Sequence, residues 1–326
     1  MRLLPVLAVF LASCAGALPV AEYVNPVLDR DFTDPAVLRA ADGNFYVYAT
    51  QSMAGDQVLN IQVARSRDLV RWEHLGDALP VKPHWAGQKQ NIWAPHVTHD
   101  SARRSYIMYY SAEPDNAKGK CLAVATSALA SGPFVDSGEP LLCGDGIEHI
   151  DPMAFDDPKT GKRLLYWGSG SRPIRVRELA PDRLRFAHGS EAREVLRPDP
   201  GRAYHSLIEG AWVIYRGGTY YLFYSGDRCC GSKASYALMV ARSNDAFGPF
   251  ETFAGAILVK NAHWLAPGHN SVIADDAGTD WILYHAMRSA PERLMLLDRI
   301  EYLDGWPRVK DDQPSVSRQI APALRR

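Results

Sequence analysis

The stretch Thr219-Tyr220-Tyr221-Leu222-Phe223-Tyr224-Ser225 is rich in aromatic residues and ends in a small polar residue. It follows the turn-forming pair Gly217-Gly218, and an alternating aromatic run bounded by such a turn is typical of a β-strand. Similar runs recur about every 60 residues along the chain. They occupy residues 44–50, 105–111, 163–169 and 279–285. The sequence is therefore a fivefold repeat of one β-rich unit.

Most of these runs are followed by a short loop and a second alternating strand, as at residues 61–66, 121–127 and 236–243. Five units of three or four short antiparallel strands fit a five-bladed β-propeller better than a sandwich. A lone sheet could not bury both of its faces, so neighbouring blades must stack. We therefore predict an all-β fold, with residues 18–326 forming one propeller of four-stranded antiparallel blades.

The composition excludes several classes of protein. The chain of 326 residues carries 36 basic and 37 acidic side chains, a formal net charge of −1. Such a balance creates no field that would attract polyanions, which argues against nucleic-acid binding. Since no apolar run reaches the roughly 18 to 20 residues that a spanning helix needs, no membrane-spanning segment is expected.

The N-terminus has the features of a secretory signal peptide covering residues 1–17. Arg2 is followed by the apolar run Leu3 to Leu11 and then by small residues. Two processing sites compete. Cleavage after Ala15-Gly16-Ala17 would release a secreted or periplasmic protein, whereas the lipobox-like Leu11-Ala12-Ser13-Cys14 would leave a lipid anchor on Cys14.

Four cysteines lie beyond Cys14. Cys121 and Cys143 flank one repeat, and we expect them to form a disulfide in an oxidising compartment. Cys229 and Cys230 are adjacent, so they form either a vicinal disulfide or two free thiols. We expect both to lie on loops that surround the propeller axis.

Acidic residues occur at matching places in the repeats, in the short segment upstream of each aromatic run. Counting back by a fixed interval from the ends of four runs gives Asp34, Pro95, Glu209 and His269, and in the third repeat Asp151 lies slightly further back. The inner strands of a propeller converge on its axis, so three carboxyl groups and an imidazole are predicted there. An Asp-Pro turn at Asp34 and Asp151 is the simpler alternative, but it does not explain Glu209.

Three carboxyl groups in one polar pocket suit glycoside hydrolysis. That reaction needs a protonated acid for the leaving oxygen and a carboxylate that acts as base or nucleophile. A third carboxylate can raise the pKa of the acid by like-charge repulsion. The residues thus favour a glycosidase, with a carbohydrate-binding propeller as the non-enzymatic alternative.

Several segments, in this order, resemble glycoside hydrolase family 43, and the similarity spans nearly the whole mature chain. The segments are Asp34-Pro35-Ala36-Val37, Trp93-Ala94-Pro95-His96, Ile150-Asp151-Pro152, Glu209-Gly210-Ala211, Gly268-His269-Asn270-Ser271 and Asp304-Gly305-Trp306-Pro307, the last resembling a closing strand. The resemblance implies a catalytic propeller and an inverting mechanism. It makes Asp34 the general base, Glu209 the general acid, and Asp151 the residue that tunes and orients Glu209.

The resemblance also implies further contacts in the site. The histidine that matches His269 touches substrate or an axial calcium ion, held partly through water, and a metal-free histidine is the alternative. Arg288 would bind sugar hydroxyls or, alternatively, be a solvated loop arginine. Trp93 would stack on a sugar ring or, alternatively, pack between blades. No cofactor is required for the hydrolysis itself.

The substrate expected from this resemblance is arabinose-containing polysaccharide of the plant cell wall. We favour an exo-acting α-L-arabinofuranosidase on arabinan or arabino-oligosaccharides. Endo-1,5-α-L-arabinanase activity is the nearest alternative, followed by β-xylosidase activity, because fold alone does not choose among them. We expect the protein to be a monomer.

Overall fold

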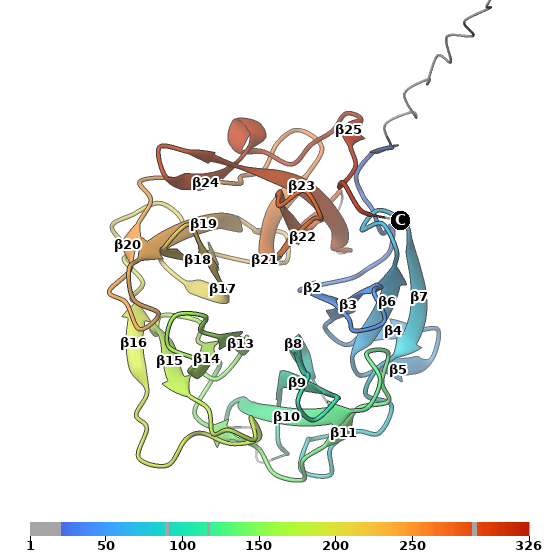
Figure 1. The fold of residues 1–326 in the computed structure, drawn as a ribbon, viewed down its shortest axis with the longest axis vertical. Coiled ribbons are helices and arrows are strands. Elements are labelled where there is room, and N and C mark those ends of the chain that lie inside the picture. The colour runs from blue at the N-terminus through green and yellow to red at the C-terminus, as the bar shows by residue number, and fades with distance from the viewer. Residues whose placement is uncertain (1–20, 89–90, 116–117, 289–291, 326) are drawn as a thin grey trace, which may run out of the picture.

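The computed structural model describes residues 21–88, 91–115, 118–288 and 292–325. Five antiparallel sheets are arranged like blades around a central axis (Figure 1). The predicted all-β, five-bladed propeller is confirmed. Among the described residues the helical content is one short 3-10 turn, η1 (Lys310–Asp312). The described part of the chain contains no helix that is long and apolar enough to cross a membrane.

The first three blades follow one another along the chain, each running from the axis outwards. Blade 1 consists of β2 (Ala36–Arg39), β3 (Phe45–Ala49), β6 (Gln62–Ser66) and β7 (Trp72–Asp77). Blade 2 consists of β8 (Trp93–Asp100), β9 (Ser105–Ala112), β10 (Cys121–Ser127) and β11 (Val135–Asp136), and β12 (Leu142–Cys143) also pairs with β10. Blade 3 consists of β13 (Met153–Asp156), β14 (Arg163–Trp167), β15 (Ile174–Glu178) and β16 (Arg193–Leu196).

The last two blades have the same order. Blade 4 consists of β17 (Ile208–Arg216), β18 (Thr219–Gly226), β19 (Ala237–Ser243) and β20 (Glu251–Thr252). Blade 5 consists of β21 (Leu265–Ala274), β22 (Asp280–Met287), β23 (Leu294–Leu303) and β24 (Trp306–Val309). A hairpin of β4 (Ser52–Ala54) and β5 (Gln57–Leu59) extends from blade 1.

The aromatic runs of the sequence are the second strands of the blades, and they carry the core. Residues such as Tyr48, Tyr109, Tyr166, Tyr224 and Tyr284 are completely buried. Each sheet places these side chains against the neighbouring blade, and burial of large aromatic surfaces stabilises the stack. Several of the tyrosine hydroxyl groups reach outward to a backbone or carboxylate acceptor, which satisfies their hydrogen-bonding potential.

The ring is closed by the N-terminal segment rather than by residues 304–307, which we expected to resemble a closing strand. Trp306 begins β24, the outer strand of blade 5. Closure comes from residues ahead of blade 1: Leu28 bridges to Met295 in β23, and the side chain of Asn25 donates a hydrogen bond to the Leu297 carbonyl. In addition, β1 (Glu22–Tyr23) pairs with β25 (Gln319–Ile320), so the two ends of the described chain lie side by side (Figure 1).

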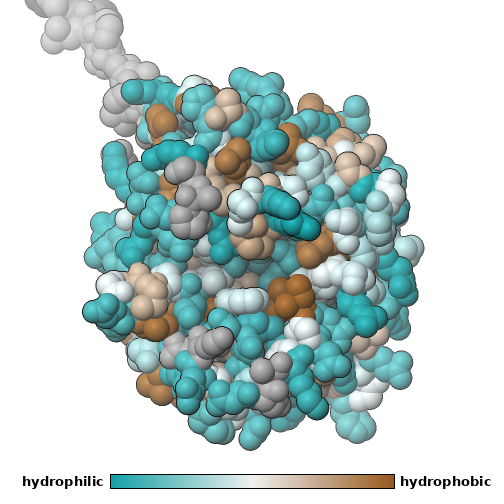
Figure 2. Space-filling model, turned by 180° about the vertical axis from the view of Figure 1, so that it is seen from behind, coloured by the Kyte–Doolittle hydropathy of each residue, from teal (hydrophilic) through white to brown (hydrophobic). Residues whose placement is uncertain are grey.

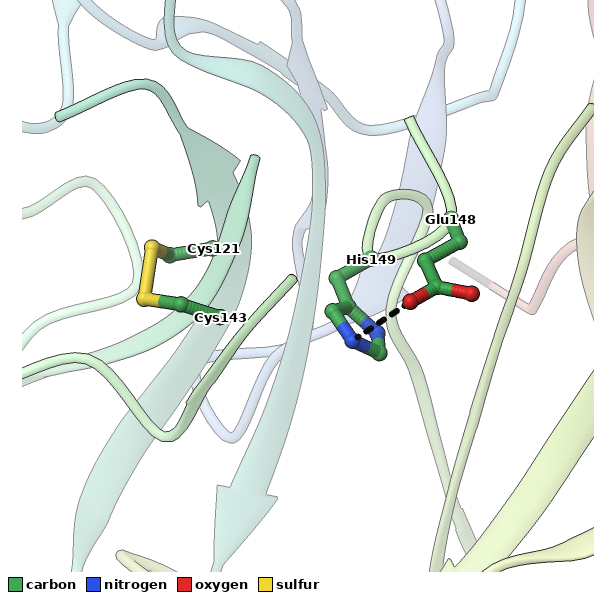
Figure 3. The surroundings of a disulfide bond; sticks show 4 residues. All are labelled: Cys121, Cys143, Glu148 and His149. Atoms are coloured by element: carbon green, nitrogen blue, oxygen red, sulfur yellow. Dashed lines mark ion pairs between the residues drawn. A yellow bond between two sulfur atoms is a disulfide. The ribbon is translucent and has the colours of Figure 1, made fainter. Parts of the chain in front are cut away.

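The face behind that of Figure 1 is mainly hydrophilic, with a few hydrophobic residues beside a hollow near its centre (Figure 2). The predicted disulfide between Cys121 and Cys143 is confirmed, and it joins the neighbouring strands β10 and β12 (Figure 3). The predicted signal peptide, including Cys14, lies outside the described residues.

Candidate active site

A pocket of about 600 Å³ lies at one end of the inner strands. Its wall includes Asp34, Asp151 and Glu209, together with Trp93 and His269. The structure therefore brings together five residues that the sequence placed in the site, and they come from all five blades. Three carboxyl groups in one partly enclosed pocket are the arrangement expected for acid–base chemistry.

The backbone turns sharply where each inner strand meets the pocket. In every blade one residue at this point has a positive φ, and these residues are Asp34 (58°), Ala94 (45°), Asp151 (59°), Gly210 (64°) and His269 (47°). The fixed count along the sequence reached the turn residue at Asp34 and His269, and it reached Pro95 and Glu209, each one residue from the turn. The inner strands β8, β17 and β21 all contain register shifts near this point, so a constant spacing locates the turn only to within one residue.

Neighbouring blades are linked at this turn by a repeated hydrogen bond. The N–H of the positive-φ residue donates to the side chain that ends the aromatic strand of the preceding blade. These bonds are Ala94 to Thr50 Oγ1 (2.9 Å), Asp151 to Ser111 Oγ (3.2 Å), His269 to Ser225 Oγ (2.8 Å) and Asp34 to His285 Nδ1 (3.1 Å). The small polar residues that end the aromatic runs thus connect the blades around the pocket.

The link between blades 3 and 4 is different. Here the N–H of Gly210 donates to Oδ2 of Asp151 at 2.9 Å, instead of to Ser169. The hydroxyl of Ser169 is consequently used by Glu209, whose Oε2 it contacts at 2.6 Å. Through this hydrogen bond Asp151 fixes the backbone of Gly210, the residue that follows Glu209. Such a contact is consistent with the predicted role of Asp151 in orienting Glu209.

Asp34 is held as a carboxylate. Its Oδ2 accepts a hydrogen bond from Thr50 Oγ1 at 2.5 Å, and its Oδ1 lies 3.2 Å from Nδ1 of His269. Burial alone would raise the pKa of Asp34, but His269, His285 and Arg293 outweigh it and hold the pKa well below its usual value. An ionised carboxylate at neutral pH is what a general base requires.

Glu209 has the opposite tendency. It is 8% exposed, and burial raises its pKa, with the negative charge of Asp34 adding to the effect. The hydrogen bonds from Ser169 and from the Tyr236 hydroxyl, at 2.8 Å from Oε1, act against the rise but do not cancel it. Gly268 lets the ring of Tyr236 approach, since a Cβ there would lie 2.2 Å from it. A carboxyl group with a raised pKa suits a general acid.

Asp151 and Glu209 act on each other through charge. Burial first, and then the charges of Glu209 and Asp34, raise the pKa of Asp151 well above its usual value. His269 lies between the two aspartates, with Nδ1 3.8 Å from Asp151 Oδ2. Gly210 allows this approach: a Cβ at Gly210 would meet the His269 ring at 3.3 Å. Carboxyl groups this crowded hold a proton more tightly than isolated ones, because the charge of each disfavours ionisation of the other.

The remaining wall of the pocket includes residues that sequence reasoning missed. Arg293, from the segment after β22, lines the pocket, whereas Arg288 lies outside it, 3.8 Å from Asp29 and over the ring of Trp264. Sequence patterns give only a weak signal for Arg293, because Arg288 and Arg293 are close in sequence and no periodicity distinguishes them. Cys229 and Cys230 also line the pocket, as the loop position suggested, and both are free thiols.

A calcium ion on the axis would need six to eight oxygen ligands. The axial cavity is lined by His96, Asp151, His269 and Asn270. Asn270 is 2% exposed, and its side-chain oxygen and nitrogen find no hydrogen-bond partner among the described residues. One carboxyl group, one amide oxygen and imidazole nitrogens fall short of the oxygen ligands that calcium needs. The described residues also contain no group of three or more His, Cys, Asp or Glu placed to hold a metal. Calcium is therefore given no part in the mechanism.

Comparison with known proteins extends this picture to two curated relatives. The chain is 25% identical to the extracellular exo-α-(1→5)-L-arabinofuranosidase ArbA of Cellvibrio japonicus, an alignment that covers 90% of each chain. It is 28% identical to arabinan endo-1,5-α-L-arabinosidase C of Emericella nidulans, over 93% of this chain and 99% of the relative.

Among solved structures, a thermostable family-43 glycoside hydrolase superposes with a TM-score of 0.78 at 26% identity, covering 93% of this chain and 100% of that one. The model of glycosyl hydrolases family 43 matches residues 23–307, which include every carboxylate of the pocket. The chain belongs to glycosyl hydrolases family 43 and is a glycoside hydrolase.

Proposed function

We propose that this enzyme is an inverting, exo-acting α-L-arabinofuranosidase that removes arabinose units from arabinan or arabino-oligosaccharides. The observation that carries the chemistry is the opposite environment of two carboxyl groups in one pocket. The pKa of Asp34 is held low by its histidine and arginine neighbours, whereas burial raises the pKa of Glu209. Such a pair provides a base and an acid at the same pH.

In this mechanism the Asp34 carboxylate accepts a proton from water as the water attacks the anomeric carbon. Glu209 donates its proton to the leaving glycosidic oxygen from the opposite face of the sugar. Asp151 fixes the backbone beside Glu209 through the Gly210 N–H, and repulsion between the two carboxyl groups favours a proton on the pair. An inverting enzyme leaves room for the water, so its two carboxyl groups stand roughly 6.5 to 9.5 Å apart.

Substrate contacts are assigned by their place in the pocket. Trp93 is the flat apolar surface on which a sugar ring stacks, and His269 contacts the sugar at the axis. Arg293, rather than Arg288, is the arginine that hydrogen-bonds sugar hydroxyls, because it lines the pocket beside the catalytic residues. Ile147 and Leu207 give the wall an apolar part suited to the C–H groups of a furanose.

The names of relatives support arabinan as the substrate class, and they divide over the mode of cleavage. ArbA of Cellvibrio japonicus is named an exo enzyme and supports exo action, although coverage does not decide the mode, because it is 90% for ArbA and 99% for the Emericella nidulans relative. The Emericella nidulans relative and a Bacillus subtilis relative are named endo enzymes, so endo-1,5-α-L-arabinanase is the second candidate. Several relatives are named extracellular, which supports secretion of this chain.

Product analysis tests the proposal. Debranched linear arabinan and reduced arabino-oligosaccharides would be digested, and the products separated over time. Exo action gives arabinose alone from the first time point, whereas endo action gives mixed oligomers early. Release of xylose from xylo-oligosaccharides, with none of arabinose from arabinan, would overturn the substrate. The Glu209→Gln variant, which keeps the size of the side chain, is the matched inactive control.

A further inference from the structure

The indole ring of Trp93 has a buried positive charge against one of its faces. The ammonium nitrogen of Lys120 lies 3.3 Å from the centre of the ring, and Lys120 is only 3% exposed. Trp93 lines the catalytic pocket, while Lys120 does not. Because the ammonium group covers one face of the ring and Lys120 does not line the pocket, the opposite face is the one left for a ligand.

The ammonium group is held in place by more than the ring. It donates a hydrogen bond to the carbonyl of Asn91 at 2.8 Å and lies 3.6 Å from Oε2 of Glu113. The same Oε2 accepts a hydrogen bond from the side chain of Asn91 at 2.8 Å. Asn91 itself lines the pocket two residues before Trp93, so Lys120 connects the ring to the backbone that leads into β8.

The backbone of Lys120 is fixed by the segment around the disulfide. The N–H of Lys120 donates to the Gly146 carbonyl at 2.8 Å, and the next residue, Cys121, is bonded to Cys143. Gly119 lets the two segments touch, because a Cβ there would lie 2.2 Å from the Gly144 carbonyl oxygen. Lys120 is thus placed by a rigid backbone arrangement and not by a flexible loop alone.

The same segment continues toward the catalytic residue of blade 3. Gly144 packs against the ring of His149, since a Cβ on Gly144 would lie 2.4 Å from Nε2. Figure 3 shows His149 and Glu148 near the disulfide, with the ion pair of 3.4 Å between them. His149 also accepts a hydrogen bond from the indole of Trp167 and lies two residues before Asp151. The disulfide segment therefore adjoins both Lys120 and the approach to Asp151.

We propose that Lys120 is a positioning residue for substrate binding: its ammonium group fixes the plane of the Trp93 ring so that the opposite face serves as the sugar platform. A cation that sits over an indole in a water-poor site attracts the ring and restricts its rotation. The effect is on binding, because Lys120 reaches neither the pocket nor the reacting groups. The proposal rests on the proposed function, which supplies the sugar.

Kinetics of three variants test this role. Lys120→Met keeps the length of the side chain and removes its charge, Lys120→Arg keeps the charge, and the exposed Lys118→Met is the matched control. With arabino-oligosaccharides, we expect Lys120→Met to raise KM by about 3- to 10-fold with kcat little changed. Lys120→Arg should restore much of the loss, and Lys118→Met should match the wild type. An unchanged KM in Lys120→Met would overturn the proposal.

A double-mutant cycle separates positioning from general destabilisation. If Lys120 acts through the ring, Lys120→Met has no further effect on KM when Trp93 has already been replaced by alanine. The same fold-change in both backgrounds would contradict the proposal. Thermal unfolding of each variant identifies any loss that is due to unfolding.

A readout that needs no substrate keeps this inference apart from the proposed function. Burial lowers the pKa of Lys120 to about 8, against the opposing charge of Glu113, the charged group that faces it. Wild-type tryptophan fluorescence should therefore change with a midpoint near that pH, and Lys120→Met should abolish the change. If no arabino-oligosaccharide is cleaved but the fluorescence change is present, the substrate is wrong and the contact stands. If the fluorescence of the wild type and of Lys120→Met is the same at every pH up to the titration of an ordinary lysine, the contact between ammonium and ring is wrong.

Discussion

The carboxylate of Asp151 accepts the backbone N–H of Gly210 at 2.9 Å, across the boundary between blades 3 and 4. At the other blade boundaries the corresponding N–H is bonded to a serine, a threonine or a histidine that ends the aromatic strand. Asp151 thus takes over a structural hydrogen bond, and Ser169 becomes available to Glu209. This single change in the repeated hydrogen bond therefore affects both the position of the backbone at Gly210 and the ionisation of Glu209, the proposed acid.

Replacing Asp151 by asparagine tests this coupling. The amide oxygen of Asp151→Asn can still accept the Gly210 N–H, so the geometry is kept while the negative charge is lost. The proton shared by the pair should then be lost at lower pH, because Glu209 ionises without a second carboxyl group whose charge opposes its own. We expect the alkaline limb of the kcat–pH profile to move to lower pH and kcat at neutral pH to drop about 10- to 100-fold. An alkaline limb at its wild-type position would show that Asp151 does not tune Glu209.

Removing the Tyr236 hydroxyl should have the opposite sign. This hydroxyl donates to Glu209 Oε1 at 2.8 Å and lowers the pKa of the acid by stabilising its charged form. In Tyr236→Phe the pKa of Glu209 should rise, and the alkaline limb should move to higher pH by about one pH unit. The two variants form a matched pair measured in the same buffers. A shift in the same direction for both would contradict the assignment of that limb to Glu209.

The disulfide should contribute to stability and to substrate binding together. The cysteines are 22 residues apart, and closing a loop of this length stabilises a fold by about 3 kcal/mol. Urea unfolding of the double variant Cys121→Ser/Cys143→Ser should show a loss of this order, with a raised KM because Lys120 precedes Cys121. The double variant Cys229→Ser/Cys230→Ser is the control for thiol content and should unfold like the wild type. Equal loss in both variants would refute a specific role of the disulfide.

Cys230 should be the reactive thiol of the pocket. A hydrogen bond with Cys229 lowers its pKa to about 6, and Arg293 assists against the effect of burial. The thiolate is therefore abundant at pH 7, where an ordinary cysteine is mostly protonated. Iodoacetamide at pH 7 should label Cys230 and inhibit hydrolysis, and an oligosaccharide should protect. The Cys230→Ser variant should resist inhibition; inhibition of that variant at the wild-type rate would contradict the prediction.

The fold and the presence of three carboxyl groups in one pocket could be predicted from the sequence because both follow from repetition. The aromatic runs mark the second strand of every blade. Because the inner strand pairs with this second strand, its position in the sequence can be estimated from the aromatic run. The fixed count back to the axis reached the turn residue at Asp34 and His269, whereas Asp151 was reached by allowing for a longer hairpin in the third repeat. At Glu209 the count reached a residue of the pocket that precedes the turn residue Gly210, because a constant spacing cannot follow register shifts in the inner strands.

Contacts made by loop residues could not be predicted from the sequence. Arg288 and Arg293 are close in sequence, but only Arg293 lines the pocket, and its backbone is held by hydrogen bonds to Asp31 and Phe32. The contact between Lys120 and Trp93 depends on the position of the disulfide segment, which brings residue 120 behind the start of β8. Such contacts join residues with no common periodicity, so neither pattern nor spacing predicts them.

The stereochemistry of the first product tests the central claim most directly, namely that Asp34 is a base and Glu209 an acid on opposite faces of the sugar. Proton NMR would follow the anomeric signals during rapid hydrolysis of an α-1,5-linked arabino-oligosaccharide, before mutarotation mixes them. The account predicts that β-L-arabinofuranose appears first and that the α anomer follows by mutarotation. Initial release of the α anomer would mean retention of configuration and would contradict the mechanism.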